Sequence, residues 1–195
     1  MQYTMKTILI ILALCVLAIP GFSQEEKVYT KKELRKIAKE ERKAQREAEE
    51  AAMRELTEIM LSNHRFVLEA DYVGDNKGAR IPVNSTINFI AVDSNKAVLQ
   101  LGTTYGMGYN GVGGITVDGN VTKYELKVIE GKKSKSYNLL IIVMTSLGTY
   151  DISFMLNDRG YGDATVRGNT MGQLRYSGNL VPLDISRVYK GTSIY

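Results

Sequence analysis

The segment Leu101–Asn120 reads Leu-Gly-Thr-Thr-Tyr-Gly-Met-Gly-Tyr-Asn-Gly-Val-Gly-Gly-Ile-Thr-Val-Asp-Gly-Asn, and no other stretch of the chain is so rich in glycine. Segments with the alternating pattern of β-strands flank it on both sides. Glycine adopts positive φ angles and lets two backbones approach closely. We therefore interpret this segment as the irregular centre of an all-β domain.

The residues after the glycines predict a β-hairpin. Asp118-Gly119 lies between alternating apolar residues within Gly114–Ile129. An Asp-Gly pair in that setting is typical of a two-residue type I′ turn. We expect two paired strands to meet at this turn.

Similar alternation, separated by turn residues, predicts further antiparallel strands. Pro82 lies in a short extended piece that is expected to be either a sheet edge or a connection, because proline cannot donate a ladder hydrogen bond. The tail Asp184–Tyr195 is expected to add one short strand. The total is about eight to ten strands, which form either a closed barrel or a two-sheet sandwich. The other predicted strands are Arg65–Val73, Thr86–Val92, Ala97–Leu101, Tyr137–Thr145, Tyr150–Leu156, Tyr161–Arg167 and Gln173–Val181.

A long charged helix is predicted before the β domain, from about Thr30 to Ser62. Thr30 and Glu33 have the spacing of a capping box, and no glycine or proline interrupts the segment up to Ser62. Apolar residues are sparse in the first half and denser from Ala51 to Met60, so we expect only the second half to pack on the domain. A solvated spacer explains the helix better than a nucleic-acid-binding arm, because lysine and arginine are nearly matched by glutamate over the whole segment. A coiled coil is the other structure that such a pattern allows.

Met1–Ser23 has the pattern of a secretory signal. Lys6 precedes the apolar run Ile8–Ile19, and Gly21 and Ser23 are small residues at the expected cleavage positions. The run is shorter than the roughly 20 residues of a typical spanning helix, although an uncleaved anchor remains the alternative. Cleavage would also remove Cys15, the single cysteine of the chain. The expected organisation is a signal peptide at 1–23, a charged helical spacer at 24–62 and an antiparallel β domain at 63–195.

The β part contains motifs that are similar to a known family. They include Phe66–Ala70, Phe89–Val92, Leu99–Gly102, Tyr109–Gly114, Gly119 and Tyr176–Leu183. In these segments the chain resembles DUF4251, a family of exported Bacteroidetes proteins of unknown function. The resemblance covers roughly two-thirds of the chain and implies an exported β domain. It implies no activity or ligand, and it does not account for the charged helix.

The glycine-rich segment also holds the tentative ligand-binding residues. Gly106–Gly111 matches G-x-G-x-x-G, but β sequence rather than a helix comes after it, so we expect no dinucleotide site. Loops on rigid β scaffolds often carry binding residues. On that basis a ligand mouth is expected at Tyr105, Met107, Tyr109 and Asn110, with coverage of the barrel end as the plainer alternative.

Other chemistry-bearing residues favour structural roles. His64, the single histidine, is expected to end the helix. There is no second histidine for a triad, and cleavage of the signal would leave no cysteine for a zinc site. Asn157–Asp163 lacks the spacing of a calcium loop and is expected to form a β-turn. Lys132, Lys133 and Lys135 are expected to form a solvated hairpin tip. We therefore predict no catalytic residue, no metal site and no cofactor.

The sequence favours a non-catalytic binding or interaction module of the cell envelope. The alternative is a β-barrel carrier of a small apolar or amphipathic ligand. The expected location is the periplasm or outer envelope of a Gram-negative bacterium, since an exported chain that loses its single cysteine suits that compartment. The expected partner is an envelope protein or a small ligand, with no nucleic acid, and with membrane contact only through the signal segment before cleavage.

Overall fold

A computed structural model describes residues 29–103, 111, 113–132, 134–168 and 172–193. The chain divides into two compact units, 1–43 and 44–195. The signal predicted at 1–23 lies outside the described residues and stays a prediction. The predicted boundary between spacer and β domain at Ser62 also stays a prediction, although the unit that contains the β-strands begins at Ala44, inside the helix.

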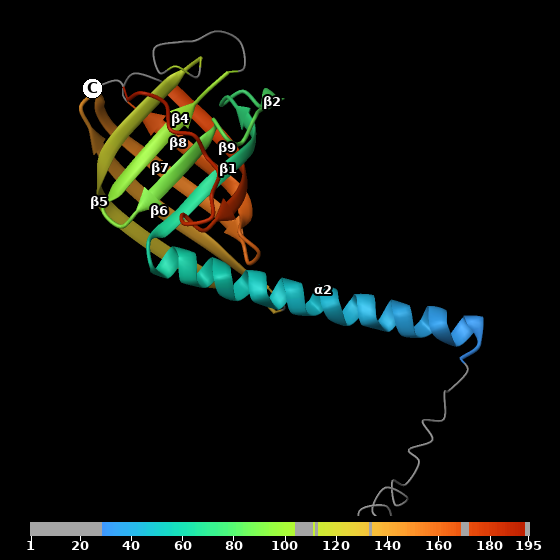
Figure 1. The fold of residues 1–195 in the computed structure, drawn as a ribbon. Helices are drawn as coiled ribbons and strands as arrows, with labels where there is room; N and C mark the ends of the chain where they lie inside the picture. Colours follow the sequence, from blue (N-terminus) through green and yellow to red (C-terminus); the bar gives the residue numbers. More distant parts are fainter. Residues whose placement is uncertain (1–28, 104–110, 112, 133, 169–171, 194–195) are drawn as a thin grey trace, which may run out of the picture. The chain divides into compact units, whose positions relative to one another are not determined.

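The second unit is a closed antiparallel β-barrel (Figure 1). In the described part of the chain, eight strands succeed one another around the barrel, and β1 pairs with both β3 and β9, which closes the ring. The short strand β2 (Arg80–Pro82) pairs only with the end of β1 and is an edge strand, one of the two structures expected for the piece that contains Pro82. The barrel strands are β1 (Arg65–Gly74), β3 (Phe89–Asp93), β4 (Lys96–Leu101), β5 (Ile115–Glu130), β6 (Lys135–Thr145), β7 (Gly148–Asn157), β8 (Tyr161–Gly168) and β9 (Gly172–Val181).

The barrel arises from the period-two pattern of its strands. Along β7 the side chains alternate between buried and exposed from Tyr150 to Leu156, because successive residues of a strand point to opposite faces. The inward residues form one apolar core in which the rings of Phe66 and Phe154 meet edge to face, with centroids 5.7 Å apart. The predicted all-β class of the domain is therefore confirmed. Because β1 pairs with β9, the domain is a closed barrel rather than a two-sheet sandwich.

The hairpin predicted at Asp118-Gly119 is wrong. These residues lie inside β5, where Asp118 pairs with Val98 of β4 and Gly119 pairs with both Ala97 of β4 and Thr145 of β6. A Cβ on Gly119 would lie 2.6 Å from the Met144 carbonyl oxygen, so the glycine allows a close approach of β6 rather than a turn. An isolated glycine in a strand often marks such an approach.

The tail does not form the predicted strand. Every barrel strand already has two neighbours, so the closed ring offers the tail no free edge to pair with. Instead, the described residues 182–193 are held on the barrel by individual hydrogen bonds, several of which use backbone atoms of the tail. The buried Gln100 amide donates to the Tyr189 carbonyl at 2.7 Å, and its oxygen accepts from the Gly191 amide at 2.7 Å.

Helix α2 (Lys31–Ser62) begins and ends where the sequence predicts. The Thr30 amide donates to the Glu33 carboxylate at 2.8 Å, and the Thr30 hydroxyl accepts from the Glu33 amide, which completes the capping box. His64 has a φ of 55° just after the helix, and its ring stacks on Tyr124 with centroids 3.6 Å apart. Among the described helical residues, none belongs to a helix long and apolar enough to cross a bilayer.

The end of α2 covers one end of the barrel. Thr57, Met60 and Leu61 are buried, and the Leu61 carbonyl accepts a hydrogen bond of 2.7 Å from the Tyr124 hydroxyl. We refer to this end, where the β5–β6 and β7–β8 turns also lie, as the base of the barrel (Figure 1). The burial confirms that the second half of the helix packs on the β domain.

Deleting residues 25–50 is expected to leave the barrel folded. The buried residues of α2 begin at Thr57, and Glu50 contributes only solvent-exposed ion pairs, which are typically worth less than about 1 kcal/mol. Thermal unfolding monitored by circular dichroism should therefore give nearly the same melting temperature for the truncated and native chains. A large drop would show that the deleted segment stabilises the barrel.

Candidate binding groove

The sequence-predicted ligand residues Tyr105, Met107, Tyr109 and Asn110 lie outside the described residues. Their described neighbours behave as the glycine content predicts. Gly111 and Gly113 have φ angles of 74° and 75°. A Cβ on Gly114 would overlap the carbonyl oxygen of Leu101 and lie 2.8 Å from its carbonyl carbon. Turns and close backbone approach thus explain the described glycines.

An apolar pocket lies inside the barrel at the end opposite the base. It encloses about 20 Å³, which is room for roughly one water molecule. The described apolar side chains that line this pocket therefore leave little free space in it. Its lining consists of Leu99, Leu101, Ile115, Val117, Tyr150, Val166, Gly168, Gly172, Leu174 and Tyr176.

A larger polar groove lies at the base of the barrel, and we call it the basal groove. It has a volume of about 400 Å³ and is open to solvent. Helix α2 forms one wall and the β5–β6 turn forms the other. Three cationic and three anionic side chains line it, so its walls carry both signs of charge. The described residues that line it are Arg54, Glu58, Glu130, Gly131, Lys132, Ser134, Lys135, Tyr137 and Asp158.

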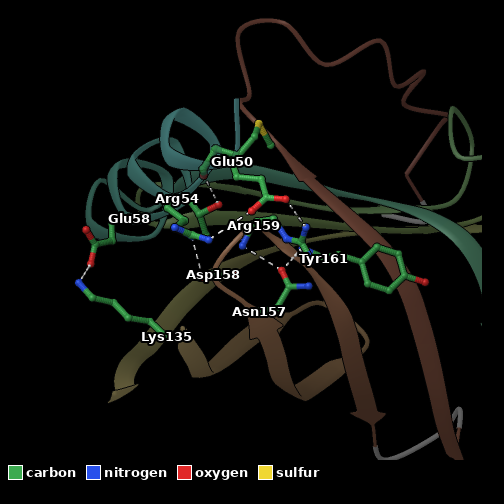
Figure 2. Close-up of polar contacts among 10 residues, drawn as sticks. Glu50, Arg54, Glu58, Lys135, Asn157, Asp158, Arg159 and Tyr161 are labelled. Atoms are coloured by element: carbon green, nitrogen blue, oxygen red, sulfur yellow. Dashed lines mark hydrogen bonds and ion pairs between the residues drawn. The ribbon is translucent and has the colours of Figure 1, made fainter. Parts of the chain in front are cut away.

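One ion-pair network fixes the helix against the β7–β8 turn (Figure 2). The Nε of Arg54 lies 2.9 Å from Oδ2 of Asp158, whose side chain is only 9 % exposed. Glu50 contacts Arg54 at 3.4 Å and Arg159 at 3.3 Å. Asp158 is nearly buried, so loss of Arg54 would leave its charge buried without this partner. Within this network, breaking the Arg54–Asp158 pair is therefore expected to destabilise the fold most.

The β7–β8 turn holds Asp158 in position through its own sequence. The Asn157 side-chain oxygen accepts hydrogen bonds from the Arg159 amide at 2.9 Å and from the Tyr161 amide at 3.0 Å (Figure 2). Gly160 has a φ of 80°, which favours glycine. The predicted β-turn is confirmed, and its aspartate contacts the helix.

A second ion pair crosses the groove from helix to barrel. Nζ of Lys135 donates to Oε1 of Glu58 at 2.6 Å (Figure 2). This hydrogen bond and the positive charge of Lys135 lower the pKa of Glu58 below its ordinary value of 4.5. The same contact raises the pKa of Lys135, and burial raises the pKa of the adjacent Tyr137. Both partners of the pair are therefore charged at neutral pH.

We expect the carboxyl group of Glu58 to titrate below its ordinary pKa of 4.5 in the folded protein. A lowered folded pKa means that the pair stabilises the fold at neutral pH, and that this contribution is lost as pH falls through the folded pKa. Nuclear magnetic resonance of the side-chain carboxyl carbon measures the midpoint directly. Lys135→Gln should move the midpoint of Glu58 back toward the ordinary value, and an unchanged midpoint would show that Lys135 is not its partner.

Three described carboxyls have a shifted pKa, and all three shifts favour the charged form. Glu33, Glu58 and Glu125 are the described carboxyls with a resolved shift, and the pKa of each is lowered by hydrogen bonds and charge. Such groups hold no proton at neutral pH and are poor general acids. His64 stacks on Tyr124 away from the groove lining. Within the described part of the chain, no three His, Cys, Asp or Glu residues gather as metal ligands would.

Sequence reasoning did not find the basal groove. Its partners are far apart in the chain, since Arg54 precedes Asp158 by more than half of the sequence. The one local signal is an aspartate in an Asn-Asp-Arg-Gly turn near a barrel end, and that pattern by itself indicates only turn chemistry. Of the predicted basic tip, Lys135 pairs with Glu58, whereas Lys133 lies outside the described residues.

The fold and the groove define a class of protein: an antiparallel β-barrel with a helix across its base and a charged groove between them. Residues 44–180 match the model of the family described as Domain of unknown function (DUF4251), so the chain belongs to the DUF4251 family. The match begins within α2, which agrees with the extent of the compact unit.

Comparison with solved structures supports this membership. The barrel is similar to the crystal structure of a DUF4251 family protein from Bacteroides eggerthii DSM 20697, with a TM-score of 0.56 and 29% sequence identity. The similarity covers 71% of this chain and 93% of that chain. A comparison with curated proteins found no match.

Proposed function

We propose that this protein is an exported, non-catalytic binding module of the cell envelope, and that the basal groove holds a segment of a partner protein. The observation that carries the proposal is the groove itself: a cleft of about 400 Å³ whose walls present both signs of charge. A segment that carries acidic and basic side chains complements such walls.

The groove walls are held in place before a partner arrives. Arg54 is held by Asp158, and Lys135 is held by Glu58, so binding does not have to order these long side chains. Ordering a flexible side chain on binding costs about 0.5–1.5 kcal/mol, and preorganisation avoids that cost. Lys132 and Glu130 are exposed at the rim, where they can meet the partner first.

Export is the second part of this proposal. Its support is the sequence Met1–Ser23, with a cationic start, an apolar run and small residues before Gln24. We place the mature protein in the periplasm or outer envelope of a Gram-negative bacterium. Amino-terminal sequencing of the protein purified from its cells tests this, and a chain that still begins at Met1 in the cytosol would contradict it.

The carrier function is the second candidate, and the apolar lining of the barrel pocket favours it. The volume of that pocket weighs against it, because about 20 Å³ is far below the roughly 300–1,000 Å³ of typical ligand sites. A carrier would therefore need the core side chains to move apart. Native mass spectrometry of the protein purified from cells would reveal a retained ligand as an added mass.

Site-specific photo-crosslinking in living cells tests the groove. A photoreactive amino acid replaces Lys132 at the groove rim in one variant, and Ser153 on the outer face of β7 in a matched control. We expect Lys132 to give one dominant crosslinked protein and Ser153 to give none. The same product from both positions, or a retained apolar molecule without any crosslink, would overturn the proposed groove function.

A further inference from the structure

The first unit carries a strongly basic surface that the barrel and its groove do not use. Between Lys31 and Lys43, α2 holds seven cations and three carboxylates, a net charge of four positive units. At about 3.6 residues per turn, all seven cations fall within about 140° of the helix circumference. We call this surface the basic face: Lys31, Lys32, Arg35, Lys36, Lys39, Arg42 and Lys43, all of them exposed.

The other side chains of this half of the helix lie outside that arc. Glu33, Glu40 and Glu41 point to the remaining circumference, as do Leu34 and Ile37. The excess of cations over carboxylates also ends at Lys43, the last residue of the first unit. From Ala44 to Ser62, two arginines face five glutamates, which gives a net charge of three negative units.

The arrangement destabilises an isolated helix. Lys31 with Arg35, Lys32 with Lys36, and Arg35 with Lys39 are like charges at i,i+4, where opposite charges would stabilise. Lys31 and Lys32 also lie at the helix N-terminus, where the macrodipole favours anions. The second half shows the stabilising arrangement, with Glu50 and Arg54 paired at 3.4 Å. A helix that served only as a spacer would gain nothing from separating its charges in this way.

We infer that the basic face binds the anionic headgroups of a phospholipid bilayer. The face is straight and about 20 Å long, so a flat surface can contact all seven cations together. Each lysine or arginine near an anionic membrane contributes favourable electrostatic energy, and the contributions accumulate. The export proposed above favours a membrane over nucleic acid, because an exported chain meets the anionic headgroups of the envelope membranes, and this step rests on that part of the proposed function. This inference does not depend on the basal groove.

Vesicle co-sedimentation of the predicted mature chain from Gln24, which contains every described residue, tests the inference. The probes are vesicles of phosphatidylcholine alone and of phosphatidylcholine mixed with phosphatidylglycerol. We expect at least roughly tenfold tighter binding to the anionic vesicles, with the difference removed by high salt. Equal binding to both vesicle types would overturn the inference.

A charge-swap variant separates the basic face from net charge. K39E/E40K/E41R/R42E keeps the composition and net charge but moves two cations off the face and places two anions on it. Its new carboxylate at position 39 lies four residues after Arg35, so an opposite-charge i,i+4 pair replaces a like-charge pair and helix content by circular dichroism should not fall. We expect its binding to anionic vesicles to drop at least about tenfold.

Two results would overturn the inference, one from the charge-swap variant and one from a parallel binding assay of the native chain with a duplex oligonucleotide. The first is undiminished vesicle binding by the variant, which would show that net charge rather than the basic face is responsible. The second is tighter binding of the native chain to a duplex oligonucleotide than to the anionic vesicles, which would assign the basic face to nucleic acid instead.

Discussion

Replacing Gly178 with valine is expected to lower the free energy of unfolding by about 3 kcal/mol and the melting temperature by about 10 °C. Gly178 lies in β9 at the seam that closes the barrel, where it pairs with Ala70 of β1 and Gly162 of β8. A Cβ there would overlap the Glu69 carbonyl oxygen and lie 2.8 Å from Cα of Ala70. Both are backbone atoms, so neither moves away as a flexible side chain would.

Asn179→Val is the matched control for this prediction. Asn179 is the exposed neighbour of Gly178 in β9 and receives the same new side chain without a backbone clash. Its free energy of unfolding should change by no more than about 0.5 kcal/mol. Similar melting curves for the two variants, monitored by circular dichroism, would show that β9 does not approach β1 as closely as the seam requires.

The glycine-rich segment Leu101–Asn120 gives a related expectation. Gly113→Val or Gly114→Val should also unfold or misfold the domain. Gly113 has a positive φ that valine strongly disfavours, whereas a side chain on Gly114 would overlap Leu101. Normal expression with an unchanged melting curve would contradict this.

Replacing Leu61 with alanine is expected to lower the free energy of unfolding by about 3 kcal/mol. The Leu61 side chain is fully buried at the base of the barrel, and its removal leaves a cavity among core residues. The effect should appear as a lower midpoint in urea denaturation with an unchanged slope. The result would show that the end of α2 is part of the barrel core.

Ile59→Ala provides the control within the same helical turn. Ile59 is 48 % exposed, so its truncation removes little buried surface. Its denaturation midpoint should stay close to that of the native chain. Equal midpoints for Leu61→Ala and native protein would contradict the placement of Leu61 in the core.

Local patterns were enough to predict most of the elements. The capping box placed the start of α2, and alternation placed strands such as β7 and β8, because both signals are carried by neighbouring residues. Asp118-Gly119 shows where local signals fail. An Asp-Gly pair by itself favours a turn, but pairing with β4 and β6 on either side holds these residues inside one long strand.

The candidate groove depended on contacts that local patterns do not contain. Arg54 meets Asp158, and Glu58 meets Lys135, only after the barrel closes and the helix packs across its base. Local patterns also could not distinguish a barrel from a sandwich, because the difference depends on the pairing of β1 with β9. Such long-range pairings arise from the whole fold rather than from any one segment.

Hydrogen–deuterium exchange of the α2 amides tests most directly the central claim that the end of this helix belongs to the barrel and builds the groove with it. Amides of Thr57–Leu61 should exchange as slowly as those of the core strand β6, because both would open only with the barrel. Amides of Arg35–Lys43 should exchange much faster. Exchange of Thr57–Leu61 at the rate of Arg35–Lys43 would contradict the claim.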